Sequence, residues 1–265
     1  VPLKEYLIGA VAAEMPADYS VEALKAQAVC CHSYALSLKL TNKDKPELNG
    51  AWLTVNPTAK EGYITKEIMQ TLWQTDFNTN YAKIQTAVDE VVNVVATFNG
   101  SPALTCYHAI SAGQTENSAN VWQQELPYLT GTDSTLDVTS PNFLQTQTFT
   151  PQQMYDALIV NFTGLDLTCD PANWFGEINY STAGYATSLV LNKGVTVEGK
   201  DFRNALCLAS TALEIEYADD RFVITTKGYG HGVGLSQYGA NALALTGKTY
   251  SEILQHYFVG IMLSE

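Results

Sequence analysis

The carboxylate of Glu14 is the group whose surroundings best suit acid–base chemistry. It lies between Ala12-Ala13 and Met15-Pro16, and no cation follows it within four residues. Partial burial in such a setting disfavours the ionised form and raises the pKa of a carboxyl group, as a general acid near neutral pH requires. Taken alone, however, an exposed glutamate in a turn that ends a helix is the more common explanation of this pattern.

Two basic side chains follow in an apolar helical pattern. Lys25 and His32 are seven residues apart, so they share one stripe beside the apolar face, about 10 Å apart along the helix axis. Cations placed there would hold anionic or hydroxyl-rich groups of a ligand. A pair of this kind, taken alone, is more often a solvated helix edge.

Four alternating glycines occur in the segment Gly228-Tyr-Gly-His-Gly-Val-Gly234. Their spacing does not match G-x-G-x-x-G, and the chain contains no G-x-x-x-x-G-K-[ST], so both nucleotide-binding motifs are excluded. Alternate glycines permit positive φ and close backbone approach. The side chains of Tyr229, His231, Gln237 and Tyr238 would project at this tight turn. We interpret the segment as one wall of a site, and not only as a connection.

Signals for metals and disulfides are weak. Cys106 and His108 would share one face of a strand, but two ligands do not make a site, and neither H-E-x-x-H nor paired C-x-x-C occurs. We therefore predict no metal and no other cofactor. An odd number of cysteines forms no regular framework, so most are expected to be small buried side chains, with one disulfide left open. They are Cys30, Cys31, Cys106, Cys169 and Cys207.

The composition limits the class of ligand. The 265 residues carry 27 acidic and 14 basic side chains, a net charge of −13, which excludes nucleic acid and anionic membrane surfaces as partners. Only 15% of residues are charged, against roughly 25% in typical soluble domains, so the surface suits neutral or sugar-like ligands. No apolar stretch approaches the roughly 18 residues of a membrane span. We expect any signal or membrane anchor to precede Val1.

The elements that position these residues are helices and antiparallel hairpins, arranged in blocks along the chain. This arrangement predicts an α+β fold. We expect a single catalytic domain over residues 1–265 with a substrate cleft. Predicted helices cover 2–13, 20–40, 63–73, 83–90 and 235–246, and others begin at 151 and 251; residues 41–62 form a loop. Predicted strands cover 91–97 and 103–110, joined by an Asn-Gly turn, and 174–180, 185–191, 213–217 and 221–226.

A specific combination of motifs runs over essentially the whole chain. It consists of Val1-Pro-Leu-Lys-Glu-Tyr-Leu7 with Ala12-Ala-Glu-Met-Pro16, then Glu22-Ala-Leu-Lys-Ala-Gln-Ala28, Ile110-Ser-Ala-Gly-Gln-Thr-Glu-Asn117 with Val121-Trp122, and Gly230-His-Gly-Val-Gly-Leu-Ser-Gln-Tyr-Gly-Ala240. In this order the segments resemble the SpoIID/LytB domain family, which includes stage II sporulation protein D and the amidase enhancers.

The resemblance implies a lytic transglycosylase that cleaves peptidoglycan glycan strands, preferably after an amidase has removed their stem peptides, and leaves 1,6-anhydromuramyl ends. It implies an extracytoplasmic protein of the bacterial cell envelope, secreted or anchored, with a cell-wall amidase as partner. Glu14 matches the family's catalytic acid/base. The residues expected to contact the glycan are Lys25, His32, Tyr107, Ser111, Glu116, His231, Gln237 and Tyr238. For Glu116 a role in capping a turn beside Gly113 is at least as plausible.

The chain departs from the family pattern at two places. Arginine is typical of sporulation members where His32 stands, so ligand binding is expected to be weaker and dependent on pH. The zinc motif of many clostridial members would fall on Thr54, Ala59 and Lys60, none of which replaces its cysteine and histidine ligands. A zinc ion carried over from the family would therefore be wrong here.

Two other functions stay open at this point. One is a non-catalytic glycan-binding module that enhances an amidase. The other is a hydrolytic muramidase that uses Glu14 with Glu116 and a water molecule. In each case the lactyl carboxylates of the glycan would be repelled by an acidic protein, so Lys25 and protonated His32 are expected to act as local cations.

Overall fold

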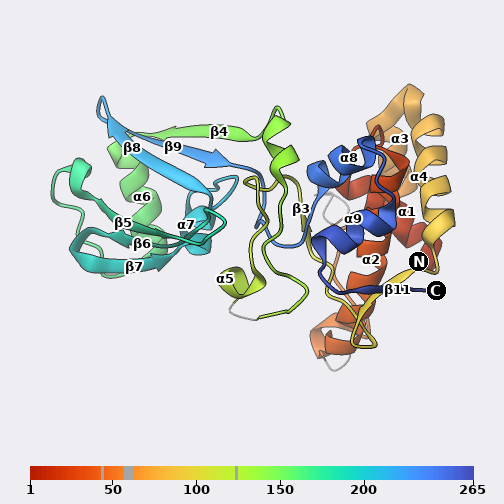
Figure 1. Cartoon of the computed structure of the whole chain (residues 1–265). Helices are drawn as coiled ribbons and strands as arrows, with labels where there is room; N and C mark the ends of the chain where they lie inside the picture. The colour runs from red at the N-terminus through yellow and green to blue at the C-terminus, as the bar shows by residue number, and fades with distance from the viewer. Residues whose placement is uncertain (43–44, 57–61, 123–124) are drawn as a thin grey trace. The chain divides into compact units, whose positions relative to one another are not determined.

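The computed structural model describes residues 1–42, 45–56, 62–122 and 125–265. The chain divides into two compact units, coloured along the chain in Figure 1. Val1–Tyr107 and Ala240–Glu265 form the first, here called the helical unit, and His108–Gly239 form the second, the sheet unit. The described elements confirm the predicted α+β fold class. That residues 1–265 work as one domain stays a prediction.

The helical unit surrounds the long central helix α2. Its helices are α1 (Leu3–Glu14), α2 (Val21–Asn42), α3 (Lys66–Trp73), α4 (Phe77–Val91), α9 (Tyr250–Tyr257) and the larger part of α8 (Gln237–Leu245), with 3-10 turns at Pro46–Leu48 and Gln74–Asp76. A three-stranded antiparallel sheet completes it, in the order β11 (Met262–Ser264), β1 (Val95–Phe98) and β2 (Ser101–Pro102).

Local chemistry sets where these helices end and begin. Helix α1 stops at Glu14 because Met15 precedes Pro16 and is extended, with φ −119° and ψ 142°. Thr65 caps α3, since its side chain accepts a hydrogen bond from the N–H of Ile68. The predicted helix over 20–40 is confirmed, whereas α3 begins three residues later and α4 six residues earlier than predicted.

The sheet unit contains two three-stranded antiparallel sheets with two helices, α6 (Pro151–Asn161) and α7 (Gly199–Ala205) (Figure 1). One sheet has the order β4 (Leu144–Phe149), β9 (Arg221–Lys227), β8 (Leu213–Ala218), and the other β5 (Phe175–Tyr180), β6 (Ala186–Leu191), β7 (Val195–Glu198). Shorter elements are α5 (Ser118–Trp122), β10 (Leu235–Ser236) and 3-10 turns at Thr135–Thr139, Pro171–Asn173 and Asn192–Gly194. The short strand β3 (Tyr107–His108) has one residue in each unit.

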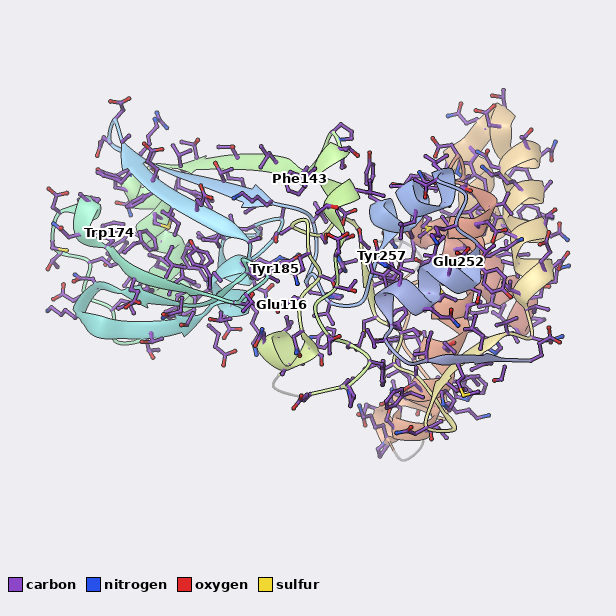
Figure 2. All side chains as sticks on the ribbon, in the orientation of Figure 1. Glu116, Phe143, Trp174, Tyr185, Glu252 and Tyr257 are labelled. Carbon is purple, nitrogen blue, oxygen red and sulfur yellow. The ribbon has the colours of Figure 1, made fainter. Side chains whose placement is uncertain are left out.

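Aromatic side chains form the centre of the core of the sheet unit. Trp174, labelled in Figure 2, stacks on Phe222 with ring centroids 5.5 Å apart, and Phe202 from α7 is fully buried beside them. Burying large aromatic rings removes much apolar surface from water and stabilises the unit. Neither α7 nor the strands β4 and β7 were expected from the sequence.

The strand predicted over 103–110 is wrong as a continuous strand. Within this range only β3 is formed, because the N–H of Cys106 turns back to the carbonyl of Leu104 (3.0 Å) and the hydroxyl of Thr105 donates to the carbonyl of Cys30 (2.8 Å). These bonds replace strand pairing. The predicted helix over 235–246 begins only at Gln237, after β10.

Membrane helices and disulfides can be assessed from the described residues. No helix in that part of the chain has both the length and the apolarity needed to cross a bilayer. All five cysteines are free thiols. The expectation of burial is confirmed for Cys30, Cys31 and Cys106, while Cys169 and Cys207 are exposed.

Candidate active site

Glu14 is half-buried at the last residue of α1, and the chain returns to it from a distant segment. The backbone N–H of Gly62 donates to Oε1 of Glu14 over 3.3 Å. The same segment is fixed to α1 further back, where the N–H of Ile64 donates to the carbonyl of Gly9 (3.1 Å). A Cβ at Gly9 would lie 2.2 Å from the ring of Tyr63, so only glycine permits this approach.

The groups coupled electrostatically to Glu14 are two phenols and a thiol. Burial raises the pKa values of Tyr6, Cys31 and Tyr107, and the charge of Glu14 adds to each shift. The thiol of Cys31 lies 3.9 Å from the phenol oxygen of Tyr107. At neutral pH all three groups are therefore protonated and neutral. Tyr6 was not singled out from the sequence, and Cys31 was expected only as a small buried side chain, because no local motif connects either residue with Glu14.

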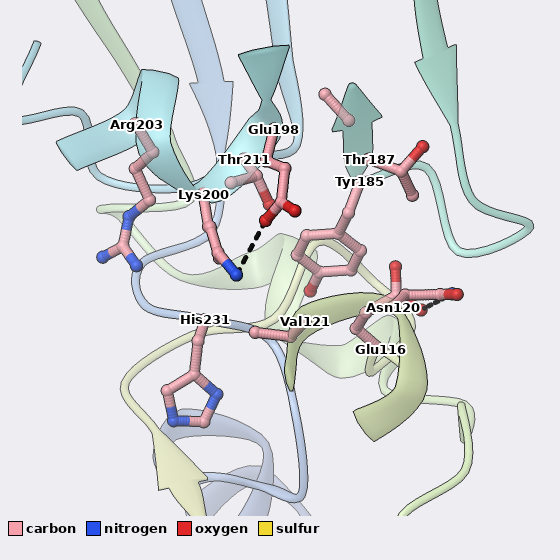
Figure 3. Close-up of a pocket in the computed structure, with 11 residues that line it drawn as sticks. Glu116, Asn120, Val121, Tyr185, Thr187, Glu198, Lys200, Arg203, Thr211 and His231 are labelled. Atoms are coloured by element: carbon pink, nitrogen blue, oxygen red, sulfur yellow. Dashed lines mark hydrogen bonds and ion pairs between the residues drawn. The ribbon is translucent and has the colours of Figure 1, made fainter. Parts of the chain in front are cut away.

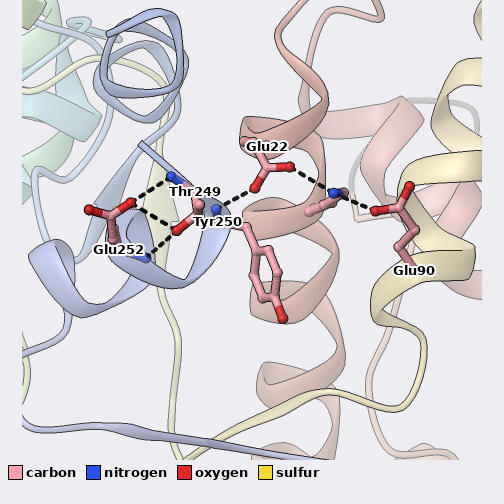
Figure 4. A network of polar contacts seen from close by, with 6 residues as sticks. Glu22, Glu90, Thr249, Tyr250 and Glu252 are labelled. Carbon is pink, nitrogen blue, oxygen red and sulfur yellow. Dashed lines mark hydrogen bonds and ion pairs between the residues drawn. The ribbon is translucent and has the colours of Figure 1, made fainter. Parts of the chain in front are cut away.

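Lys25 lies between two carboxylates, unlike the open cation expected from the sequence. Its amine is 2.7 Å from Oε1 of Glu22 and also forms an ion pair with Glu90 of α4, and its side chain is only 12% exposed. The other oxygen of Glu22 accepts the N–H of Tyr250 at the start of α9 (2.7 Å; Figure 4). Lys25 therefore connects α2 with α4 and, through Glu22, with α9.

His32 is buried in α2 and does not lie at a solvated helix edge. Its Nδ1 lies 3.1 Å from the carbonyl oxygen of Val94, which fixes the proton on that nitrogen. Burial lowers the pKa of His32 below its usual range, so the imidazole is neutral at pH 7. A neutral His32 does not match the local cation expected from the sequence, while its contact with the glycan stays a prediction.

In the sheet unit the buried carboxylate of Asp137 organises the loops that carry Ser111 and Tyr238. It accepts the N–H of Ser111 (2.8 Å) and the hydroxyls of Ser134 (3.0 Å) and Ser236 (2.9 Å). Burial raises the pKa of Asp137, and the hydrogen bonds from these donors lower it by less, so the pKa stays above its ordinary value. Asp137 was not expected from the sequence, because Ser111 and Ser236 come from distant segments and no local motif marks the residue.

Ser111 and Tyr238 are each held by this framework. Ser111 is fully buried, and its hydroxyl accepts the N–H of Gly113 (3.1 Å). The phenol of Tyr238 lies 3.3 Å from the hydroxyl of Thr139, and its N–H donates to the carbonyl of Ala109 (3.0 Å). Gln237 beside it is 7% exposed. Only Tyr238 of these expected ligands keeps a half-exposed side chain.

The Gly-rich segment confirms the expected close backbone approach. Tyr229 and Ile110 exchange backbone hydrogen bonds of 2.7 and 3.0 Å, and the N–H of Glu116 donates to the carbonyl of Gly232 (2.7 Å). A Cβ at Gly230, where φ is +118°, would lie 2.7 Å from Cβ of His108. The segment therefore packs directly against residues 108–116.

Glu116 is buried and its carboxylate is occupied. Oε1 accepts the N–H of Asn117 (2.7 Å) and the side-chain amide of Asn120 (2.8 Å), and Oε2 accepts the hydroxyl of Ser181. These contacts match the structural role that the sequence left open for Glu116. Together with His231 it lines a pocket of the sheet unit, seen in Figure 3.

Metal-binding side chains are not clustered in the described part of the chain, where no three histidines, cysteines or acidic residues could share an ion. Cys106 belongs to the helical unit and His108 to the sheet unit. Burial, with the neighbouring His231, lowers the pKa of His108 to about 3. Of the positions matched to the family zinc motif, Ala59 and Lys60 lie outside the described residues.

Comparison with known proteins finds relatives along the whole chain. A family model described as "Stage II sporulation protein" matches residues 1–98. Stage II sporulation protein D of Bacillus subtilis (strain 168) is 35% identical over all 265 residues, which cover 75% of that protein, and its counterpart in Bacillus amyloliquefaciens is 34% identical with the same coverage. A protein of Bacillus subtilis (strain 168) named amidase enhancer is 27% identical over 97% of this chain and 40% of its own length.

Proposed function

The chain belongs to the SpoIID/LytB family of stage II sporulation protein D, and from this premise we propose that it is a lytic transglycosylase of the bacterial cell wall. Its substrate is the glycan strand of peptidoglycan, preferably stripped of stem peptides, and its product carries a 1,6-anhydromuramyl end. It acts outside the cytoplasm, where this polymer lies, with a cell-wall amidase as partner and sporulation as one setting.

The observation that carries the proposal is the environment of Glu14. The carboxyl group is half-buried at a helix end and oriented by the backbone N–H of Gly62. The neighbouring Tyr6, Cys31 and Tyr107 stay neutral at pH 7, because burial raises their pKa values. Such a site leaves Glu14 as the group that exchanges a proton, which is the task of a single general acid/base.

One carboxyl group is sufficient for this reaction. Protonated Glu14 donates its proton to the glycosidic oxygen as the bond from C1 of N-acetylmuramic acid breaks. The C6 hydroxyl of the same sugar attacks C1, and the carboxylate of Glu14 removes the hydroxyl proton, which restores the acid. Because the nucleophile belongs to the substrate, its effective concentration replaces the second carboxylate of an ordinary glycosidase.

Other side chains receive roles that follow from their contacts. The phenol of Tyr107, whose pKa the charge of Glu14 helps to raise, donates to the sugar or to the departing oxygen. Tyr238, His231, Gln237 and Ser111 bind the glycan or hold the loops that do so. Lys25 positions α2 against α4 through its two carboxylate partners and does not attract the substrate by itself.

The two alternative functions differ in what supports them. A relative named amidase enhancer supports a glycan-binding module that assists an amidase without cleaving the strand. A hydrolytic muramidase would need a second carboxylate to activate water. Glu116, the residue considered for this task, is buried and has donors on both oxygens. Of the two alternatives, only the glycan-binding module therefore has support, and this support comes from the named relative.

Analysis of the product ends separates the three functions. Glycan strands treated with an amidase are incubated with the protein, and the ends are identified by mass spectrometry, with heat-denatured protein as the blank. Anhydro ends are expected. Ordinary reducing ends would indicate a hydrolase, and intact strands that remain bound to the protein would indicate a non-catalytic module.

A further inference from the structure

We propose that the pocket of the sheet unit lined by Lys200, Arg203 and His231 binds the lactyl carboxylate of a muramic acid residue. This proposal deepens the proposed function, on which the identity of the ligand rests. The pocket lies wholly within the sheet unit, and no role was expected for Lys200 or Arg203 from the sequence.

Both cations come from α7 and extend from it into the pocket (Figure 3). They are three residues apart, a spacing that places side chains on the same side of a helix. The short helix is held in place by Phe202, the fully buried residue between them. The core of the sheet unit therefore aims these two side chains at a common space.

Arg203 is the strongest sign of an anionic ligand. Its Nε donates to the carbonyl of Leu208 (3.1 Å), and burial lowers its pKa. Among the residues that the structure describes, no carboxylate forms an ion pair with this guanidinium. A half-buried charge without a partner is costly, and an anion entering the pocket would compensate it. The chain, with a net charge of −13, has only one other arginine, Arg221.

Lys200 is available to the same ligand. It forms an ion pair with Glu198 (2.7 Å), but the two side chains are 43% and 46% exposed. Exposed pairs of this kind contribute little to stability, so a ligand carboxylate competes readily with Glu198. His231 lines the same pocket, and its Nδ1 accepts the N–H of Val233 (3.1 Å), which fixes the orientation of the ring.

The remaining lining residues favour a carboxylate on a sugar over a phosphate. Glu116 and Glu198 line the same pocket and balance the charges of Lys200 and Arg203, so its formal net charge is zero. A doubly charged phosphate would leave the pocket more negative than a single carboxylate would. The side chains of Asn120 and Thr211 add amide and hydroxyl groups of the kind that bind sugar hydroxyls. Muramic acid carries one carboxylate on such a sugar, whereas glucosamine in the same strand carries none.

The two arginines of the chain make a direct test possible. The full chain is labelled with 15N, and its two arginine Nε–H signals are assigned with Arg203→Lys and Arg221→Lys. N-acetylmuramic acid, added to the wild type, is expected to shift the Arg203 signal in a saturable way and leave Arg221 in place. N-acetylglucosamine, the same sugar without the lactyl group, should leave both signals unchanged. Lys200→Gln should weaken the response at least threefold.

The outcomes distinguish this proposal from the proposed function. No shift of Arg203, equal shifts with both sugars, or equal affinity for acetate would overturn the carboxylate pocket. Such a result, together with anhydro ends from wild-type digestion, would leave the transglycosylase standing without it. A muramic-acid-specific shift in a protein that cleaves no strand would support the pocket and refute the transglycosylase.

Discussion

The backbone N–H of Gly62 donates a hydrogen bond to Oε1 of Glu14, although 48 residues separate the two in sequence. The contact forms because the same segment also binds α1 through Ile64 and Gly9. The orientation of the proposed acid/base is thus set by the backbone. A glutamine at position 14 keeps a carbonyl oxygen that accepts the same N–H, so it removes the exchangeable proton with little change in shape.

Glu14→Gln is therefore expected to lower kcat by about 10²–10⁴-fold, the usual contribution of a general acid/base. The affinity for glycan strands should stay within about threefold of wild type. Proton transfer by Glu14 stabilises only the transition state, so its loss lowers kcat without weakening substrate binding. The measurement is release of anhydro ends, with calorimetry for binding. Glu5→Gln, an exposed change in the same helix, is the control. Full activity of Glu14→Gln would remove Glu14 from the mechanism.

Tyr107→Phe tests the phenol whose pKa is raised in part by the charge of Glu14. A hydrogen bond to a charged or developing-charge group contributes about 1.5–3 kcal/mol, so kcat should fall about 10–100-fold while KM changes little. Tyr34→Phe is the matched control, since Tyr34 is also a half-buried tyrosine, and its pKa is raised by burial and by Cys106. Equal losses in both variants would show a structural effect of removing a buried hydroxyl and would contradict a role for Tyr107.

Lys25→Met is expected to lower the free energy of unfolding by about 1–3 kcal/mol, because it leaves Glu22 facing Glu90 without the cation between them. Burial by itself lowers the pKa of Lys25. The hydrogen bonds to Glu22 and Glu90 raise the pKa by more than burial lowers it, so the net shift is upward. The stabilisation is thus present below the ordinary lysine pKa of about 10.4 and is lost at more alkaline pH.

Urea unfolding measured at neutral and alkaline pH checks both parts of this prediction. Lys4→Met, which breaks the exposed pair with Asp89, should cost well under about 1 kcal/mol. Adding Glu90→Gln to Lys25→Met should restore part of the lost stability. If Lys25→Met instead unfolds like wild type but binds glycan much less tightly, Lys25 is a substrate ligand and the positioning role is wrong.

Asp137→Asn is expected to destabilise the sheet unit by about 1–3 kcal/mol, because its amide places a donor opposite the N–H of Ser111 or the hydroxyl of Ser236. The pKa of Asp137 is raised in the folded chain, so folding is favoured by its protonation. Its contribution is greatest below the ordinary aspartate pKa of about 3.9 and declines as pH rises through the raised value. The measurement is thermal unfolding between pH 3 and 7. The control Asp156→Asn, an exposed change on α6, should alter neither the stability of the protein nor its dependence on pH.

Dialysis against a chelator is expected to leave the cleavage rate unchanged. The family's zinc ligands are replaced by Thr54, Ala59 and Lys60, and none of these supplies a thiolate or imidazole. The rate is compared before dialysis, after it, and after adding zinc back. Loss of activity that zinc alone restores would show that other residues of this chain bind the ion.

The sequence alone determined the elements that local rules control. The extended conformation of Met15 before Pro16 places Glu14 at the end of α1, and apolar spacing predicts α2. The alternate glycines of 228–234 predict the close approach that the backbone then makes. Each of these three features depends on a residue and its near neighbours in the chain, so the amino-acid sequence is sufficient to predict it.

Only the tertiary structure decided which partners the polar side chains meet. Helical spacing placed Lys25 and His32 on one stripe, but Glu90 comes from α4 and the carbonyl of Val94 from the segment before β1. These partners convert one expected cation into a bridge and the other into a neutral buried ring. Asp137 likewise gained its role from segments far apart in the chain. Charge and burial of a side chain depend on everything that packs around it, and periodicity along one element carries no information about that packing.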